Sequence, residues 1–176
     1  LAVSKKEALH IKIDQSGRFP ATAFLRAMAE EYSTNESLIR LFHNTRVIKI
    51  KSPKQAEKDL LGQYIVGDIV DAATGEILIA GGSLLTEETL EMLLESDLPS
   101  LEIIDGLDDP LILHTIAEDD TNSHESALLK IYNRLRPSNP SNLDKARELF
   151  HELFFDPARY RLGRVGRFRI TRKYTQ

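Results

Sequence analysis

Apolar and polar residues alternate in a short run near the start of the chain, and the spacing then becomes helical. Residues 10–14 alternate and are followed by turn-forming residues, which predicts a strand that ends in a turn. Residues 20–32 repeat their apolar positions at helical spacing, so we expect a helix with Pro20 in its first turn. A second helix is expected next, because Ser33 and Glu36 have the spacing of a capping box.

The middle of the chain predicts a compact unit of strands and helices. Residues 45–51 alternate as a strand does, and residues 53–62 have helical spacing. Two more strands are expected on either side of the turn-forming residues 71–75. Thr86 is the expected N-cap of the next helix, since two glutamates follow it directly. Residues 100–105 then close the unit as another strand.

The last part of the chain predicts two helices and a terminal strand. An acidic connector is expected over residues 105–122. The helices follow over 123–136 and 143–155, and we expect Ser141 to cap the second of them. The run 165–172 alternates again, which predicts a strand with arginines at its polar positions.

Together these elements predict an α+β fold, in which a mixed helix and strand body holds a small inserted strand–helix unit. We expect the first part of the body over 1–52, the acidic inserted unit over 53–105, the helical second part of the body over 106–157 and a basic strand leading out over 158–176. With 176 residues the chain is long enough to bury a core. Because it lacks an initial Met and stops just after a basic run, we expect it to be a piece of a longer protein.

Formal charge is segregated along the chain, although the whole chain carries only −4. Residues 1–58 hold 11 basic and 6 acidic residues, whereas residues 59–129 hold 17 acidic residues and neither Lys nor Arg. Residues 130–176 hold 12 basic and 4 acidic residues. We expect the two basic segments to meet as one positive surface, with Arg18 and Lys49 near the C-terminal arginines and the acidic segment turned away.

The composition excludes several kinds of chemistry. There is no cysteine, so the chain has neither a disulfide framework nor a thiolate site. Its apolar runs fall short of the roughly 18 residues that span a bilayer. The five histidines have no metal-ligand spacing, and the common nucleotide-binding and hydrolase motifs are absent. We therefore expect no catalytic residue, metal site, cofactor or membrane partner in this chain.

The last twenty residues hold seven cations and no acid. A solvated strand face would explain some of them, but their number favours a polyanionic partner. Guanidinium groups bind phosphate in bidentate fashion, and each cation near a nucleic-acid backbone releases a counterion; an acidic protein partner is the alternative. Residues 163–166 also form the GxxG of KH domains, which lies between two helices there. Because a strand is expected to follow here, we interpret the glycines as a sharp turn.

Four motifs resemble the bacterial RNA polymerase β subunit, in the same order along the chain. IDQSGRFPATAFLRAM resembles a pattern of Ile-Asp, basic residues, Leu-Pro-Ala-Thr and Leu-Leu-Arg-Ala. DIVDAATGEIL with LLTEETLEMLLE is similar to an inserted unit of the same region, and DDTNSHESALLKIYNRLRPSNPSN to the run after it. ARELFHELFFDPARYRLGRVGRFRI resembles a run that ends with Tyr-Asp-Leu, a small linker and Val-Gly-Arg. The resemblance covers nearly the whole chain.

This resemblance implies a fragment of the β lobe, one wall of the cleft that holds DNA in the transcribing enzyme. The magnesium-binding aspartates of that enzyme belong to the β′ subunit, so a non-catalytic part of a cytoplasmic DNA-directed RNA polymerase, a nucleotidyltransferase, is implied. The implied partners are DNA, in particular its non-template strand and downstream part, the β′, α and ω subunits, and σ factor. The alternative to a DNA contact is a docking module for σ factor, β′ or transcription regulators.

The resemblance also implies which residues contact DNA. The family segment that matches residues 160–167 lies near the displaced strand, and Arg167 is the arginine of the Val-Gly-Arg motif. Arg161 departs from the family, because most relatives have Asp there to read a guanine, and a cation cannot accept a hydrogen bond from a base amino group. Residues 15–17 also depart, since relatives have basic residues there. The expected DNA-binding residues are Arg18, Arg161, Arg164, Arg167 and Arg169.

Overall fold

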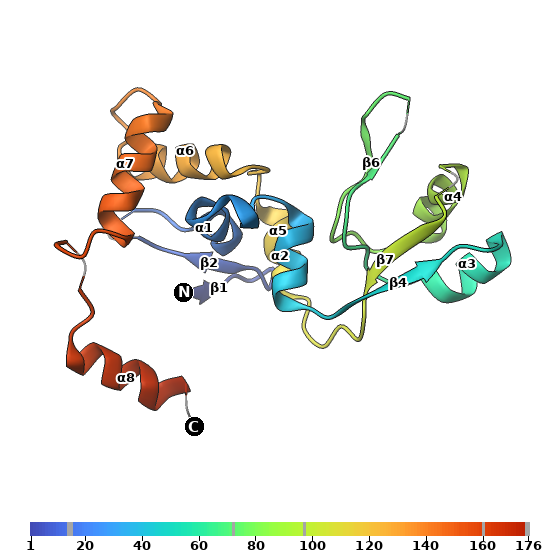
Figure 1. Cartoon of the computed structure of the whole chain (residues 1–176), viewed down its shortest axis with the longest axis horizontal. Coiled ribbons are helices and arrows are strands. Elements are labelled where there is room, and N and C mark those ends of the chain that lie inside the picture. Colours follow the sequence, from blue (N-terminus) through green and yellow to red (C-terminus); the bar gives the residue numbers. More distant parts are fainter. Residues whose placement is uncertain (14–15, 72, 97, 160, 175–176) are drawn as a thin grey trace.

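The protein is a mixture of helices and small antiparallel sheets, arranged as a body, an inserted unit and a C-terminal helix (Figure 1). The computed structural model describes residues 1–13, 16–71, 73–96, 98–159 and 161–174. The expectations for Gln15 and for Tyr160 lie outside these residues. The predicted α+β fold class is confirmed.

The core of the body lies between a three-stranded antiparallel sheet and three helices. One of these helices comes from the N-terminal part of the chain and two come from the C-terminal part. The sheet has the order β1 (Ala2–Val3), β2 (Leu9–Ile11) and β3 (Phe19–Pro20). Helix α1 (Ala21–Met28) packs on α6 (His124–Leu135), which packs on α7 (Leu143–Phe154). The rings of Phe24, Phe150 and Phe154 meet with centroids 4.8–5.6 Å apart. These aromatic contacts join α1 to α7 and so close the core.

The inserted unit has a separate core. Its main sheet pairs β4 (Thr45–Lys49) with β7 (Ser100–Ile104), and helices α3 (Pro53–Leu60) and α4 (Glu87–Glu95) pack on each other. A hairpin of β5 (Ile69–Val70) and β6 (Ile77–Ile79) completes the unit. Thr86 caps α4 as predicted, because its side chain accepts a hydrogen bond from the backbone N–H of Thr89. The buried apolar residues of this core are Ala56, Leu60, Ile65, Ile69, Ile79, Leu85, Leu90, Leu93, Leu101 and Ile103.

A third cluster of apolar side chains joins the inserted unit to the body. It contains Leu38 and Ile39 of helix α2 (Asn35–Phe42), and Leu113 and Ile116 of helix α5 (Leu111–Glu118). Val66 and Ile104 reach it from the inserted unit. The connector expected over 105–122 was therefore wrong in part, because its apolar run LILHTIA folds as a buried helix between the two cores.

Buried polar groups cross the same junction. The Arg26 guanidinium is 1% exposed and donates to the carbonyl of Ser33, which follows the short 3₁₀ helix η1 (Glu30–Tyr32), and to Asn35 Oδ1. Asn35 Nδ2 in turn donates to the carbonyl of Gly81 at 3.4 Å, and the Gly81 N–H donates to Asp68 Oδ1 at 2.6 Å. A chain of hydrogen bonds thus runs from α1 of the body to the hairpin of the inserted unit.

Two predicted helix caps are displaced by one residue. Helix α2 is capped by Thr34, because Ser33 is occupied by donating its hydroxyl to the carbonyl of Glu30 at 2.6 Å. Helix α7 is capped by Asn142, whose Oδ1 accepts from Lys145 N at 3.0 Å. The Ser141 hydroxyl instead donates to Asn133 Oδ1 at 2.8 Å.

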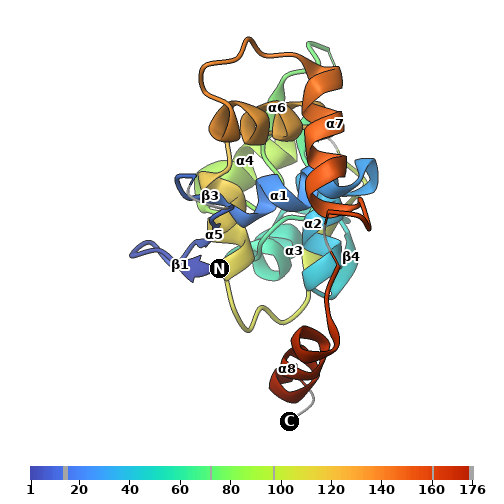
Figure 2. The same ribbon diagram turned by 90° about the vertical axis from the view of Figure 1, so that its left-hand side faces the viewer.

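The predicted C-terminal strand is wrong, because residues Arg164–Tyr174 form helix α8. Both views show α8 standing apart from the body, on the chain that follows α7 (Figures 1 and 2). In the described part of the chain no strand lies beside it. An isolated strand would leave its backbone groups unpaired, whereas a helix pairs them internally, and arginine is a good helix former.

Candidate nucleic-acid interface

Helix α8 presents cations on more than one side of an exposed element. Arg164 and Arg167 are three residues apart and share one side, whereas Arg169 and Lys173 are four residues apart and share another. These residues and Arg172 are all exposed, and the helix contains no acid that could pair with them. Three of the five predicted DNA-binding residues therefore lie on one helix.

The start of α8 is fixed by the glycine pair of the GxxG run. The carbonyl of Gly163 accepts the Arg167 N–H at 3.0 Å, and the Arg167 side chain donates through Nε to the carbonyl of Leu162 at 3.3 Å. A Cβ on Gly166 would lie 2.7 Å from Leu162 Cδ1, so a larger residue there would displace this leucine. Gly166 lies inside α8 rather than in a loop between helices, which differs from the KH arrangement.

Arg161 lies in the segment before α8 and its side chain is exposed. The nearby Arg159 is held differently, because its Nη1 lies 3.1 Å from Glu152 Oε2 of α7. Arg161 is therefore available to bind an external anion, whereas the charge of Arg159 is balanced by the Glu152 carboxylate.

Arg18 belongs to a second cationic site, which lies on the body. It is exposed in the loop before β3, and its carbonyl accepts a hydrogen bond from Arg134 Nη2 of α6 at 2.8 Å. Gly17 leaves room for this guanidinium, since a Cβ there would lie 3.0 Å from Arg134. Sequence reasoning missed Arg134, because only the apolar face of its helix was considered; the small residue at position 17 was the available signal.

The predicted cations do not converge on one surface. Pairing of β4 with β7 carries Lys49 into the inserted unit, far from α8 in Figure 1. Arg18 lies beside β3, and Figure 2 shows β3 and α8 well apart. The expectation that Arg18 and Lys49 meet the C-terminal arginines is therefore wrong for this arrangement. The acidic helix α4 lies at the other end of the molecule from α8 (Figure 1).

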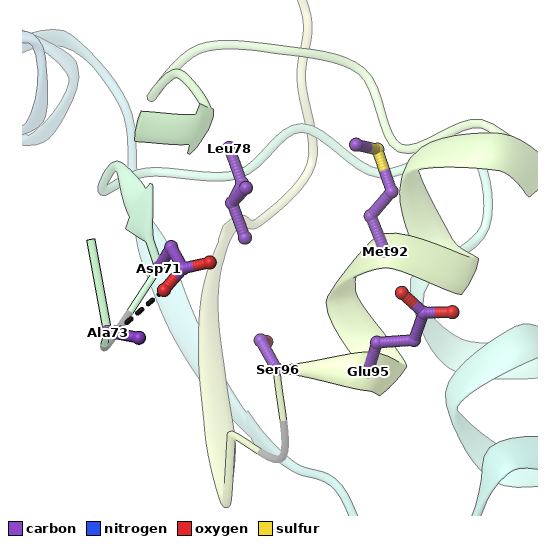
Figure 3. Close-up of a pocket in the computed structure, with 6 residues that line it drawn as sticks. All are labelled: Asp71, Ala73, Leu78, Met92, Glu95 and Ser96. Carbon is purple, nitrogen blue, oxygen red and sulfur yellow. Dashed lines mark hydrogen bonds between the residues drawn. The ribbon is translucent and has the colours of Figure 1, made fainter. Parts of the chain in front are cut away.

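A cavity of about 380 Å³ lies in the inserted unit, between the β5–β6 hairpin and α4 (Figure 3). Two of its lining residues, Asp71 and Glu95, are acidic. Hydrogen bonds from the backbone N–H groups of Thr74 and Ala73 lower the pKa of the Asp71 carboxyl. The complete lining is Asp71, Ala73, Leu78, Met92, Glu95 and Ser96. It offers no nucleophile–base pair, so its geometry indicates no active site.

The described residues contain neither a metal-binding cluster nor a membrane-spanning helix. They contain no group of three or more His, Cys, Asp or Glu side chains that could hold a metal ion. Likewise, none of the helices formed by these residues has the length and apolar character needed to cross a membrane.

Comparison with known proteins identifies related sequences over nearly the whole chain. The family profile described as RNA polymerase Rpb2, domain 2, matches residues 99–176. The chain is 47% identical to the DNA-directed RNA polymerase subunit beta of Rhodopirellula baltica, over 97% of this chain and 14% of that protein. The subunits of the same name from Protochlamydia amoebophila and Leptospira biflexa are 36% and 33% identical, each over 98% of this chain. The chain spans 14% of the length of these relatives. These similarities confirm the resemblance to the β subunit that the motifs indicated.

Proposed function

Since this chain belongs to the family of DNA-directed RNA polymerase β subunits, we propose that it forms part of a wall of the DNA channel and contacts the DNA backbone through α8. The observation that carries this proposal is an exposed helix with five cations and no acid. In the complete enzyme, a cytoplasmic nucleotidyltransferase, the segment supplies a surface and no catalytic group. Its partners there are DNA, the β′, α and ω subunits and σ factor.

The arrangement of the cations suits a phosphate backbone better than base edges. The arginines of α8 contact phosphates, which carry no information on base sequence, so the contact is independent of sequence. Arg161 extends this surface before the helix, and it replaces the base-reading acid expected from the resemblance. Arg18 and Arg134 lie too far from α8 to join it and form a separate, smaller contact with DNA.

The salt dependence of DNA binding tests this function. We would assemble polymerase with the full-length β subunit that contains this segment and measure its affinity for bubble DNA at several salt concentrations. Replacing both Arg164 and Arg167 with Gln is expected to lower the slope of log K against log salt by about 1–2, because two counterions fewer are released. Arg147→Gln is the matched control, since Arg147 lies on α7 and pairs with Glu125 at 3.6 Å. An unchanged slope in the double variant would show that α8 does not contact DNA.

A second candidate function is docking of an acidic protein on α8. The helix also exposes the apolar side chains of Val165 (67% exposed) and Phe168 (64% exposed). Apolar side chains do not bind DNA phosphates, whereas exposed apolar groups are typical of protein-binding surfaces. Reversing the charge with Arg167→Glu and Arg169→Glu separates the two functions. Loss of DNA affinity with unchanged σ factor binding supports the DNA contact, and the opposite result supports docking of σ factor, β′ or a regulator.

A further inference from the structure

Strand β4 is the edge of the sheet in the inserted unit. On its inner side it pairs in antiparallel register with β7, from Thr45 opposite Ile104 to Lys49 opposite Ser100. The far side of β7 is occupied, because Val66 N donates to the carbonyl of Glu102 at 3.0 Å. Within the described residues no strand pairs with the outer side of β4.

The hydrogen bonds at the two ends of the β4–β7 pair determine which backbone groups of β4 face outward. Ile50 N donates to the Pro99 carbonyl at 3.0 Å, and the Asn44 carbonyl accepts from Asp105 N at 2.8 Å. In an antiparallel pair such inward bonds recur at every second residue, so the groups of Arg46 and Ile48 face β7. Those of Thr45, Val47 and Lys49 therefore face away from the sheet.

Most of this outward row is open. The carbonyl of Lys49 accepts from Gln55 Nε2 at 3.2 Å, but for Val47 no hydrogen-bond partner occurs among the described residues. The Val47 side chain is 64% exposed and stands on the face opposite Ile48, which packs against the core of the unit. An edge with free backbone groups and an exposed apolar side chain is a template for an added strand.

The charge around this edge indicates what kind of strand it accepts. Residues 46–58 hold five cations and a single acid. Arg46 pairs with Asp105 at 3.3 Å, whereas among the described residues the other four cations have no ion-pair partner. These four cations are all exposed, and they are Lys49, Lys51, Lys54 and Lys58. The C-terminal end of this edge is therefore complementary to carboxylates.

We propose that the outer edge of β4 binds an extended acidic segment of a partner protein, which adds to the sheet as a strand. Five residues of β4 correspond to about 17 Å, so the segment pairs over about five residues. An apolar side chain of the segment lies beside Val47, and its carboxylates lie toward Lys49 and Lys51. DNA would use the lysines but not the backbone of β4, and this difference makes the proposal testable independently of α8.

The experiment uses polymerase assembled with the full-length β subunit and a labelled seven-residue peptide, which carries glutamate, valine and glutamate on one face of the strand, at positions two, four and six, and threonine at the positions between them. Fluorescence anisotropy measures the affinity, and hydrogen–deuterium exchange follows the amide of Val47. We expect the peptide to bind and to slow exchange at this amide. The same peptide with N-methyl groups on one edge keeps its charge but cannot pair, and it is expected to bind at least tenfold more weakly.

Val47→Pro removes the outward N–H and leaves the pairing with β7 intact, because proline is tolerated on the open side of an edge strand. It is expected to weaken peptide binding at least tenfold, whereas the control Val47→Ala weakens it threefold or less. Lys49→Gln with Lys51→Gln is expected to weaken binding and reduce its salt dependence.

Four results would overturn the proposal. They are equal binding of the N-methylated peptide, unchanged binding by a correctly assembled Val47→Pro enzyme, displacement of the peptide by duplex DNA with unchanged exchange at Val47, and slow exchange at Val47 before any peptide is added. The last result would mean that the polymerase itself covers the edge. The N-methylated peptide keeps the test decisive even if Val47→Pro fails to assemble.

Discussion

At the scale of single residues, the Asp119 carboxylate balances a buried cation. Its side chain is wholly inaccessible to solvent, and Arg26 Nε lies 3.4 Å away. The Thr22 hydroxyl donates to it at 2.7 Å, and Thr121 donates through both its N–H and its hydroxyl. Lys130 Nζ completes the set at 3.3 Å. A buried charge of this kind is stable only while all its partners remain.

Asp119→Ala is therefore expected to lower the free energy of unfolding by about 3–5 kcal/mol, because it leaves Arg26 buried without a counter-charge. Urea unfolding of the 176-residue chain measures this. Asp120→Ala is the matched control: Asp120 also pairs with Lys130 but its side chain is 81% exposed, so a loss below about 1 kcal/mol is expected. Equal losses in the two variants would show that burial of the pair is unimportant.

Gly81 permits a close approach between the hairpin and the segment before it. A Cβ at this position would lie 2.4 Å from the Val66 carbonyl oxygen, a backbone atom that cannot move aside without shifting the sheet. Gly81→Ala is expected to destabilise the chain by about 1–3 kcal/mol, measured by urea unfolding. Gly163→Ala serves as the control, since a Cβ there meets nothing within 4 Å. A neutral Gly81→Ala would contradict the described contact.

Glu102 makes stability depend on pH. Hydrogen bonds from Arg40 and Thr45 lower the pKa of its carboxyl, against the opposing effect of burial. A lowered native pKa stabilises the fold above the ordinary glutamate pKa of about 4.3, and this contribution is lost as the pH falls through the native value. The difference in unfolding free energy between wild type and Glu102→Gln is therefore expected to shrink between pH 6 and pH 3. A difference that stays constant between pH 6 and pH 3 would contradict the effect of these hydrogen bonds.

At the scale of elements, local patterns predicted most helices and strands, and non-local contacts explain the failures. The N-cap at Thr86 and the strand 100–104 needed only neighbouring residues to be recognised. Helix α5 was missed because its acidic flanks suggested a solvated connector, although its apolar face fills the junction between two cores. Helix α8 was missed because alternation predicts a strand only where a partner strand exists.

Two phenylalanines distinguish a packed helix from an unpacked one. Phe150 of α7 is 4% exposed and contacts three other rings, so Phe150→Ala is expected to lower the free energy of unfolding by about 3–5 kcal/mol. Phe168 of α8 is 64% exposed, and Phe168→Ala is expected to change the unfolding free energy by less than about 0.5 kcal/mol. Thermal or urea unfolding of both variants measures this, and a large loss for Phe168→Ala would mean that α8 packs on the body.

At the scale of the whole molecule, the distribution of charge along the sequence identified the basic segments but did not predict where they lie relative to one another. The C-terminal arginines were identified from composition alone, and four of them, with Lys173, lie on helix α8 in place of the expected strand. The placement of Lys49 and Arg18 depends on pairing of β4 with β7 and on the hydrogen bond from Arg134, which join residues far apart in the chain. Such distant pairings leave no local pattern to read, so the separate basic edge of β4 could not be predicted.

The hydrogen bond between Asp105 N and the Asn44 carbonyl, 2.8 Å long, has a consequence for how this protein can evolve. This bond joins the residue at which the chain enters the inserted unit to the residue at which it leaves. Insertions and deletions within the unit therefore leave the path of the chain in the body unchanged. Val66 and Ile104 tie the inserted unit to the body by filling part of the shared core, and Asn35 and Arg40 bond to Gly81 and Glu102 across the same junction. Related proteins that keep these apolar and hydrogen-bonding contacts are expected to tolerate changes in the rest of the inserted unit.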